Sequence, residues 1–246
     1  MHSFLLIGQS NMAGRGFLAE TVEIDTTGIY ILRNGRWQGF FRPINPDRHK
    51  SGANLAEHFA ECYHKKHGEK VGLICCADGG TTLAQWMPGE LLYDNAVFHA
   101  KLAMRTSSLA GILWHQGESD CEKDLHLSYA EKLAKMLTQL RKDLGLPNIP
   151  IVLGGLGDFL TDCPRPDWGL HNYPLINAAT QRVVNSMDNV GYAPATGLTA
   201  NPDNLHFNAA SLYEFGQRYF DAFEKLTPVV TDSAVSDTQR SEIEML

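Results

Sequence analysis

The sequence opens with the apolar stretch Phe4-Leu5-Leu6-Ile7, which runs directly into the polar stretch Gly8-Gln9-Ser10-Asn11. A short apolar run that ends at a glycine is typical of a buried strand followed by a tight turn. Ser10 then stands at the exit of the strand, where its hydroxyl can project from a strand-to-helix turn. The stretch therefore predicts the first strand of a sheet and, just beyond it, a candidate functional residue.

Similar short apolar runs recur along the chain. Together with Ser3–Ile7 they are Val71–Ala77, Gly111–His115, Ile149–Leu153 and Val190–Ala195. Longer segments with helical periodicity separate them, and this alternation is typical of parallel strands joined by crossover helices. The sequence therefore predicts an α/β protein, built as a three-layer α/β/α sandwich.

Apolar stripes at helical spacing support the helical layers of this sandwich. They comprise Leu55, Phe59, Cys62 and Tyr63; Leu133, Met136, Leu137, Leu140 and Leu144; Leu175, Ala179, Val183 and Met187; and Leu212, Phe215, Tyr219, Phe223 and Leu226. We expect each stripe to face the core.

Two segments fit neither helical nor strand periodicity. Gly14–Lys50 is rich in glycine and proline, and it contains a hairpin signal at Asn34-Gly35. Phe159–Pro174 is the second irregular segment, and long excursions of this kind often shape a site. No sharp boundary divides the chain, so we expect one domain over residues 1–230, with a flexible polar tail over residues 231–246.

Charge and composition narrow the class of protein. The net charge is −7, and no run of basic residues offers a footprint for a nucleic acid or an anionic membrane surface. No stretch approaches the about 20 apolar residues that a membrane-spanning helix needs, and the N-terminus lacks a secretory pattern. The 5 cysteines show no Cys-x-x-Cys spacing, which favours reduced thiols. We therefore expect a cytoplasmic protein without nucleic-acid or membrane partners.

The usual motifs for metals and nucleotides are missing from the sequence. The 10 histidines include no His-Glu-x-x-His pattern, and no glycine loop is followed by Gly-Lys-Ser/Thr. Neither Gly14-Arg15-Gly16 nor Gly154-Gly155-Leu156-Gly157 completes the dinucleotide fingerprint. We expect no metal and no cofactor.

Polar, glycine-rich residues follow every predicted strand. In an open parallel sheet, ligands bind beyond the carboxyl ends of the strands, so these exits are the place to look for a site. The segments are Gly8–Asn11, Asp78–Thr81, Gln116–Asp120, Gly154–Asp158 and Asp203–His206.

Four of these exits carry residue types that serine hydrolysis needs. Ser10 supplies a hydroxyl, and His206 lies three residues after Asp203, so one turn of chain can present the carboxylate to the imidazole Nδ1. Gly79 or Gly80 can bring a backbone N–H close to a substrate, and the amide of Gln116 can supply another donor for an oxyanion. Each residue also has a structural interpretation: Ser10 as a helix cap or phosphate ligand, Asp203 and His206 as a capping turn, and Gln116 as a loop-closing amide.

Four blocks of sequence, in this order, resemble those of the SGNH hydrolase superfamily. They are Gly8-Gln9-Ser10-Asn11-Met12-Ala13-Gly14, Gly79-Gly80-Thr81-Thr82-Leu83-Ala84-Gln85-Trp86, Trp114-His115-Gln116-Gly117-Glu118-Ser119-Asp120 and Asp203-Asn204-Leu205-His206-Phe207. The branch with sialate O-acetylesterases and the acetyl xylan esterases of carbohydrate esterase family six is the most similar. The resemblance extends from residue 2 to about residue 225.

This resemblance implies a fold and a set of roles. The fold is a flavodoxin-like sandwich with a five-stranded parallel sheet in the order 2-1-3-4-5. Ser10 is implied as the nucleophile, with Asp203 and His206 as its acid and base. The implied oxyanion donors are the N–H of Ser10, a glycine N–H for which Gly79 is favoured over Gly80, and the amide of Gln116, where most of the superfamily has asparagine.

Further residues in and near the blocks have open roles. Asn11 is expected to fasten a loop, and Glu118 to orient a loop, to hold Arg15 in an ion pair or to contact a sugar hydroxyl. Trp86 and Trp168 fall in predicted loops and could stack on a sugar ring, because a flat aromatic face suits a pyranose. Trp114 ends a strand and is expected in the core.

Together, the sequence predicts a serine esterase that removes O-acetyl groups from a carbohydrate through an acetyl-Ser10 intermediate. An acetylated xylo-oligosaccharide and an O-acetylated sialic acid are both candidate substrates. One alternative is an esterase or thioesterase for another acyl ester, and another is an inactive carbohydrate-binding relative. The sequence leaves the oligomeric state open.

Overall fold

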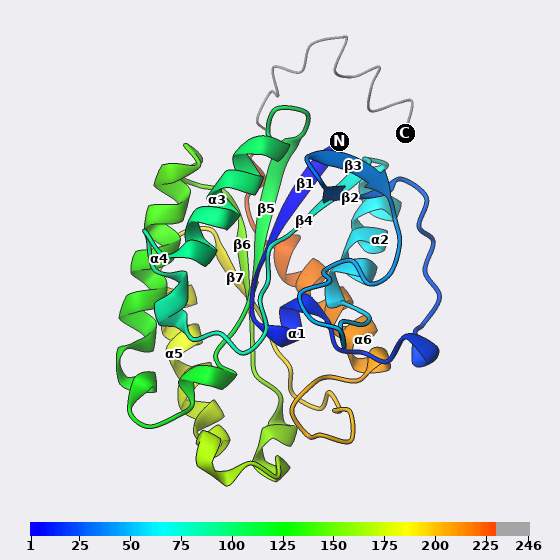
Figure 1. Cartoon of the computed structure of the whole chain (residues 1–246). Coiled ribbons are helices and arrows are strands. Elements are labelled where there is room, and N and C mark those ends of the chain that lie inside the picture. The colour runs from blue at the N-terminus through cyan, green and yellow to red at the C-terminus, as the bar shows by residue number, and fades with distance from the viewer. Residues whose placement is uncertain (230–246) are drawn as a thin grey trace.

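The computed structural model describes residues 1–229, so the tail predicted over residues 231–246 lies outside the described part. A single seven-stranded sheet runs through the molecule, with helices on both of its faces (Figure 1). The strands lie in the spatial order β3-β2-β4-β1-β5-β6-β7. The mixed α/β architecture therefore agrees with the predicted class.

The five predicted strands are all present and all run parallel to one another in this sheet. They are β1 (His2–Gly8), β4 (Val71–Cys75), β5 (Ser108–His115), β6 (Ile151–Gly154) and β7 (Val190–Ala193). They pair in parallel in the order β4-β1-β5-β6-β7, which is the expected order 2-1-3-4-5. The first strand is therefore central.

The predicted count of five strands is wrong, because the first irregular segment adds two more. β2 (Ile29–Arg33) pairs in parallel with β4, and β3 (Arg36–Gly39) pairs antiparallel with β2. The turn between them is the expected hairpin: Asn34 and Gly35 both have positive φ, at 51° and 74°. Trp37 of β3 packs so closely over Gly72 that a Cβ there would lie 2.6 Å from the indole ring.

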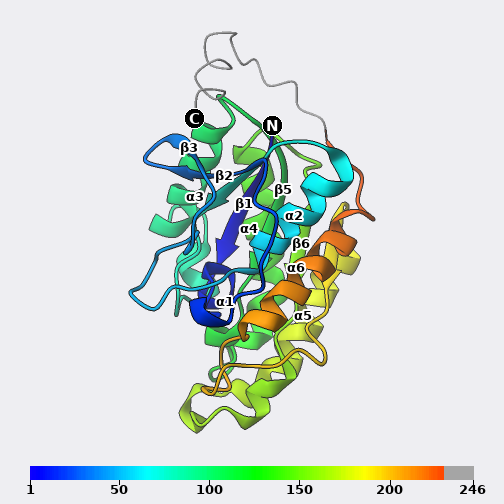
Figure 2. The same ribbon diagram turned by 90° about the vertical axis from the view of Figure 1, so that its right-hand side faces the viewer.

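Six α-helices are present in residues 1–229. They are α1 (Ser10–Ala13), α2 (Leu55–His67), α3 (Leu91–Ala103), α4 (Tyr129–Asp143), α5 (Tyr173–Ser186) and α6 (Ala209–Phe223). The α3, α4 and α5 helices cover one face of the sheet, and α2 and α6 cover the other (Figures 1 and 2). No helix within the described residues is long and apolar enough to span a membrane.

One predicted stripe is wrong in its first member, whereas Ala179 and Val183 are buried as expected. In α5 the buried side chains are Ile176, Ala179 and Val183, whereas Leu175 is 46% exposed. Helical spacing fits either leucine or isoleucine as the first member of the stripe. The angle at which α5 enters the layer decides between them, and that angle is a tertiary property.

Both faces of β1 are buried, which explains its continuous apolar sequence. Leu5 and Ile7 belong to the core under α3, α4 and α5, and Phe4 and Leu6 to the core under α2 and α6. The ring of Phe4 makes edge-on contacts with aromatic rings of α2 and α6, including Phe223 at 5.4 Å between ring centres. The strand therefore joins both halves of the core.

The carboxyl end of β1 is held tightly against β5. Gly8 has φ of +132°, and a Cβ there would lie 2.0 Å from the carbonyl oxygen of His115. The N–H of Gln9 donates to that same carbonyl at 2.9 Å. Only glycine fits this turn, which starts α1 at Ser10 and so fixes the position of the serine.

Candidate active site

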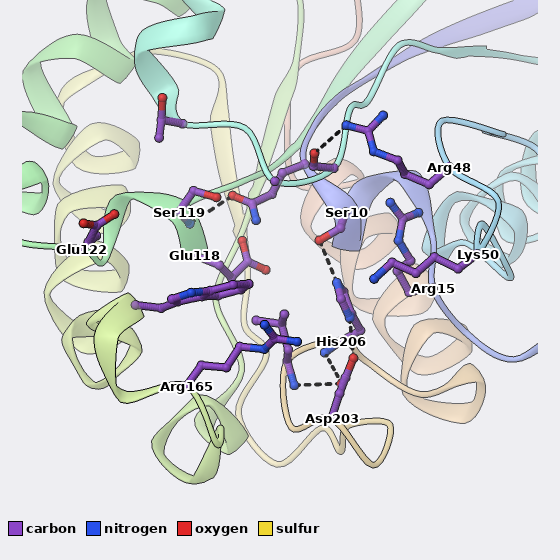
Figure 3. Close-up of a pocket in the computed structure, with 16 residues that line it drawn as sticks. Ser10, Arg15, Arg48, Lys50, Glu118, Ser119, Glu122, Arg165, Asp203 and His206 are labelled. Atoms are coloured by element: carbon purple, nitrogen blue, oxygen red, sulfur yellow. Dashed lines mark hydrogen bonds and ion pairs between the residues drawn. The ribbon is translucent and has the colours of Figure 1, made fainter.

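A pocket of about 400 Å³ lies at the carboxyl ends of the parallel strands (Figure 3). Ser10 and His206 both line it. Residues of both irregular segments also contribute, namely Arg15, Arg48 and Lys50 from the first and Arg165 and Trp168 from the second. The excursions therefore do shape the pocket at the strand exits.

Ser10, His206 and Asp203 form a continuous hydrogen-bonded chain in this pocket. The distance from His206 Nε2 to Ser10 Oγ is 3.0 Å, and that from His206 Nδ1 to Asp203 Oδ2 is 2.7 Å. The carboxylate fixes the hydrogen on Nδ1, which leaves the lone pair of Nε2 facing the serine hydroxyl. The arrangement can activate Ser10 as a nucleophile.

Asp203 is held in its ionised form. Burial raises its pKa, but the hydrogen bond from the His206 ring and those from the backbone N–H groups of His206 and Leu205 outweigh burial. The result is a pKa well below that of an ordinary aspartate. A negative charge therefore stays beside the imidazole and can stabilise an imidazolium.

Asn11 fastens the loops around this chain. Its Nδ2 donates to Glu118 Oε1 at 2.5 Å and to the carbonyl of Leu205 at 3.2 Å, and its Oδ1 accepts from the N–H of Phe207 at 3.1 Å. This geometry fits the expected loop-fastening role. The two residues on either side of His206 are thereby tied to the helix that carries Ser10.

The structure does not bring the amide of Gln116 into the pocket. Its Nε2 donates to the carbonyl of Thr81 at 3.0 Å and to Asp120 Oδ2 at 2.6 Å, and its Oε1 accepts from the Tyr129 hydroxyl at 3.0 Å. The residue is 1% exposed. Gln116 therefore differs from the expected oxyanion donor. Both hydrogens of its amide already have partners, and the side chain closes a loop.

The second-block glycines also differ from the expectation. The N–H of Gly79 donates to Asp47 Oδ2 at 2.9 Å, so it is not free for a substrate. Gly80 lines the pocket, and its N–H has no hydrogen-bond partner within residues 1–229. The available glycine donor is therefore that of Gly80.

A different side-chain amide, that of Gln9, lies in the pocket. Its Oε1 accepts from the N–H groups of Gly117 and Ser119, each at 3.3 Å. Its Nε2 has no hydrogen-bond partner among the described residues, although the residue as a whole is only 3% exposed. This residue was not predicted from the sequence, and its place directly before Ser10 at the strand exit is the signal that could have identified it.

Arg15 does not pair with Glu118, as one interpretation expected. Its guanidinium holds Asp47 instead, with Nη1 to Oδ1 at 2.9 Å and Nη2 to Oδ2 at 2.7 Å. Asp47 also accepts from the hydroxyl of Ser51 and from the N–H of Gly79. This buried pair therefore joins the first irregular segment to the second block.

The three tryptophans considered above differ in their exposure, and only Trp168 of the three lines the pocket. Trp86 is 1% exposed, with its ring edge-on to Trp114 and its Nε1 donating to Thr81 Oγ1, so the expected sugar contact is wrong for this residue. Trp114 is in the core, as expected. Trp168 is 45% exposed and lines the pocket, with the guanidinium of Arg165 4.4 Å from its ring centre.

Several cations line the pocket beside the serine, together with the carboxylates of Glu118, Glu122 and Asp203. Lys50 and Arg165 lie on opposite sides of the Ser10–His206 pair (Figure 3). Arg48 forms an ion pair with Asp78, at 2.7 Å, but no carboxylate of residues 1–229 forms an ion pair with Lys50 or Arg165. Within the described part of the chain, no group of three His, Cys, Asp or Glu side chains is arranged to hold a metal ion.

The fold and this serine site define a hydrolase of the SGNH type, and comparison with known proteins gives the family. Residues 1–225 match the sequence model of the carbohydrate esterase, sialic acid-specific acetylesterase family. The chain belongs to this family and is a carboxylic ester hydrolase.

Individual relatives agree with this assignment. The sequence is 26% identical over 247 residues to a probable carbohydrate esterase of Arabidopsis thaliana, with 89% of each chain covered. An X-ray structure of an Arabidopsis thaliana protein aligns with a TM-score of 0.81 and 25% identity, over 91% of this chain and 98% of the other.

Two further structures share the fold. NanS aligns with a TM-score of 0.70 and 17% identity, over 91% of this chain and 96% of the other. A carbohydrate acetylesterase of Xanthomonas citri aligns with a TM-score of 0.67 and 18% identity, over 91% of this chain and 56% of the other.

The buried pair of Arg15 and Asp47 gives a stability prediction. Replacement Asp47→Asn leaves the guanidinium without its countercharge, and we expect the free energy of unfolding at pH 7 to fall by about 3 kcal/mol. Burial raises the pKa of Asp47, but the hydrogen bonds and charge of Arg15 outweigh burial and the pKa is lowered. The stabilisation is therefore present above the ordinary aspartate pKa of about 3.9 and is lost as the pH falls below it.

Urea unfolding at a series of pH values from 7 downward measures this effect. The difference between wild type and Asp47→Asn should shrink as the pH approaches and passes below about 4. Asp167→Asn, at an exposed carboxyl, is the matched control and should change the free energy of unfolding by less than about 0.5 kcal/mol. An Asp47→Asn protein as stable as wild type at pH 7 contradicts the prediction.

Proposed function

We propose that this esterase removes O-acetyl groups from a carbohydrate, with Ser10 as its nucleophile. The observation that carries the proposal is the hydrogen-bonded chain from Ser10 through His206 to Asp203, which lines a pocket in a member of a carbohydrate esterase family. The retained serine, base and acid favour an enzyme over a carbohydrate-binding relative.

In the proposed mechanism, His206 Nε2 takes the proton of the Ser10 hydroxyl while Oγ attacks the acetyl carbonyl carbon. The tetrahedral intermediate collapses when its bond to the sugar oxygen breaks, and the imidazolium returns the proton to that oxygen. Acetyl-Ser10 and a free sugar hydroxyl result. Water then attacks the acetyl-serine with the same proton transfers, which releases acetate and restores Ser10.

The oxyanion of each tetrahedral intermediate needs donors that are free before the reaction. We assign this role to the backbone N–H groups of Ser10 and Gly80 and to the Nε2 amide of Gln9. All three residues line the pocket, and no partner within residues 1–229 uses these hydrogens. The backbone N–H groups that hold Gln9 Oε1 leave its NH₂ end for the pocket.

Between the two candidate sugars, the charges of the pocket favour the O-acetylated sialic acid. Lys50 and Arg165 line the pocket without ion-pair partners in the described chain, whereas the rim carboxylate Glu122 is paired with Lys123 at 2.8 Å. A sialic acid carries a carboxylate that can pair with these cations. A xylo-oligosaccharide is neutral and makes no use of them.

Acetate release with wild type and Ser10→Ala tests the function. We expect wild type to release acetate from an O-acetylated sialic acid faster than from an acetylated xylo-oligosaccharide, and Ser10→Ala to release none above background. A preference for a long-chain p-nitrophenyl ester over both sugars contradicts the proposal and favours a different acyl ester.

Lys50 and Arg165 give a second prediction. The double replacement of Lys50→Met and Arg165→Met should raise KM for the O-acetylated sialic acid about tenfold or more, because a charge-assisted hydrogen bond contributes about 1.5–3 kcal/mol. KM for the neutral xylo-oligosaccharide should change less than about threefold. Lys135→Met, on the exposed side of α4, is the matched control. Equal changes in KM for the charged and the neutral sugar contradict the assignment.

The amide of Gln9 gives a third prediction. Gln9→Glu keeps an oxygen to accept from Gly117 and Ser119 but replaces the NH₂ end, so kcat should fall about 100- to 1000-fold with little change in KM. Affinity for an alkyl boronic acid, an analogue of the tetrahedral intermediate, should fall in parallel. Gln116→Leu should instead lower the free energy of unfolding by about 1–3 kcal/mol. If Gln116→Leu lowers kcat by several hundredfold and Gln9→Glu does not, the donor is Gln116.

A further inference from the structure

The carboxylate of Glu118 has one satisfied and one unsatisfied oxygen. Oε1 accepts from Asn11 Nδ2 at 2.5 Å and lies 3.3 Å from His115 Nε2. Oε2 is buried and has no hydrogen-bond partner among the described residues. The side chain is only 3% exposed, yet Glu118 lines the pocket together with Ser10 and His206.

The Glu118 carboxylate lies at the hollow beside Ser10 (Figure 3), while its Oε1 faces the buried side chains of Asn11 and His115. Burial raises the pKa of Glu118, but the hydrogen bonds from His115 and Asn11 and the charge of His115 outweigh burial, and the pKa is lowered. Glu118 is therefore a carboxylate, and each of its oxygens can accept two hydrogen bonds. Burying a charged oxygen without a hydrogen-bond donor costs free energy. A ligand that donates a hydrogen bond to Oε2 would therefore be favoured.

The chemistry of an acetyl ester limits what that donor can be. The acetyl group itself has no N–H or O–H, so the donor must belong to the alcohol part of the ester. A carbohydrate presents hydroxyl groups on carbons next to the esterified one. We propose that Glu118 Oε2 accepts a hydrogen bond from a free hydroxyl of the substrate's alcohol part, and that Glu118 thereby makes the enzyme selective for partially acetylated polyols.

This inference rests on the proposed esterase function and deepens it. A purely structural role of Glu118, through Asn11 and His115, involves Oε1 alone. The isosteric replacement Glu118→Gln separates the structural role from the substrate contact. The amide oxygen can take the place of Oε1, while the NH₂ group takes the place of Oε2. The acceptor in the pocket then becomes a donor, and the contacts to Asn11 and His115 remain.

Two small esters provide the test. The first is 1-O-acetylglycerol, which has two free hydroxyls, and the second is 1-O-acetyl-2,3-di-O-methylglycerol, which keeps both oxygens but has no O–H donor. We expect wild type to hydrolyse the first with at least a tenfold higher kcat/KM. Glu118→Gln should lower this ratio to about one, mainly by lowering kcat/KM for the hydroxylated ester, with kcat/KM for the methylated ester within about threefold of wild type.

Glu131→Gln, at an exposed carboxylate in the first turn of α4 that does not line the pocket, is the matched control and should leave the ratio as in wild type. If Glu118→Gln lowers kcat/KM for both esters equally, Glu118 has a structural role only and the inference is overturned. A wild type that hydrolyses both esters equally well overturns the inference but leaves the esterase standing. A wild type that hydrolyses neither ester overturns the proposed function as well.

Discussion

The side-chain amide of Asn11 holds together the three parts of the chain from which the site is built. It lies in α1 directly after Ser10, and it bonds to Glu118 after β5 and to the backbone on both sides of His206. Only a side chain with a donor end and an acceptor end can satisfy a carboxylate, a carbonyl and an N–H at once. An aspartate of the same shape would place a second negative charge against Glu118.

The distance between His206 and Ser10 depends on this junction. Ser10 and His206 are separated by 196 residues, and His206 lies on a loop rather than on a strand or helix. A loop moves more readily than the sheet, so a 3.0 Å contact with Ser10 needs a local tether. The bonds from Asn11 to Leu205 and Phe207 supply it, and the Gly8 turn anchors the other side to β5.

The parallel strands and the convergence of Ser10, Asp203 and His206 could be predicted from sequence because each follows from local patterns. Buried parallel strands are continuous apolar runs, and their carboxyl ends meet at one edge, so blocks far apart in sequence converge there. The β2–β3 hairpin was recognised at Asn34-Gly35, but its pairing with β4 was not. That pairing depends on the fit of Trp37 over Gly72, which is a contact between segments and leaves no periodic signal.

The errors in the site have a shared physical origin, which is competition for hydrogen bonds. Sequence placed the amide of Gln116 and the N–H of Gly79 near the serine, but it could not show that Asp120 and Asp47 already use them. Trp86 was misplaced for a similar reason, since its Nε1 finds Thr81 within the core. Which of several nearby partners a polar group takes is decided by differences of less than 1 Å, and these arise only when the loops are packed.

The net negative charge of the whole chain contrasts with the two cations that line the pocket without an ion-pair partner in residues 1–229, and this contrast bears on what the pocket can bind. The formal net charge is −7, so the molecule as a whole repels an anion at long range. At physiological ionic strength that repulsion is screened beyond about 8 Å, and Lys50 and Arg165 then dominate for a ligand already at the mouth. Glu118, which lines the same pocket, has the opposite preference. Its Oε2 has no hydrogen-bond partner among the described residues, and this negatively charged oxygen repels an anion but can accept a hydrogen bond from a hydroxyl. Under the proposed function, the pocket suits a substrate whose carboxylate lies near Lys50 or Arg165 while its hydroxyl-bearing, esterified part reaches Ser10.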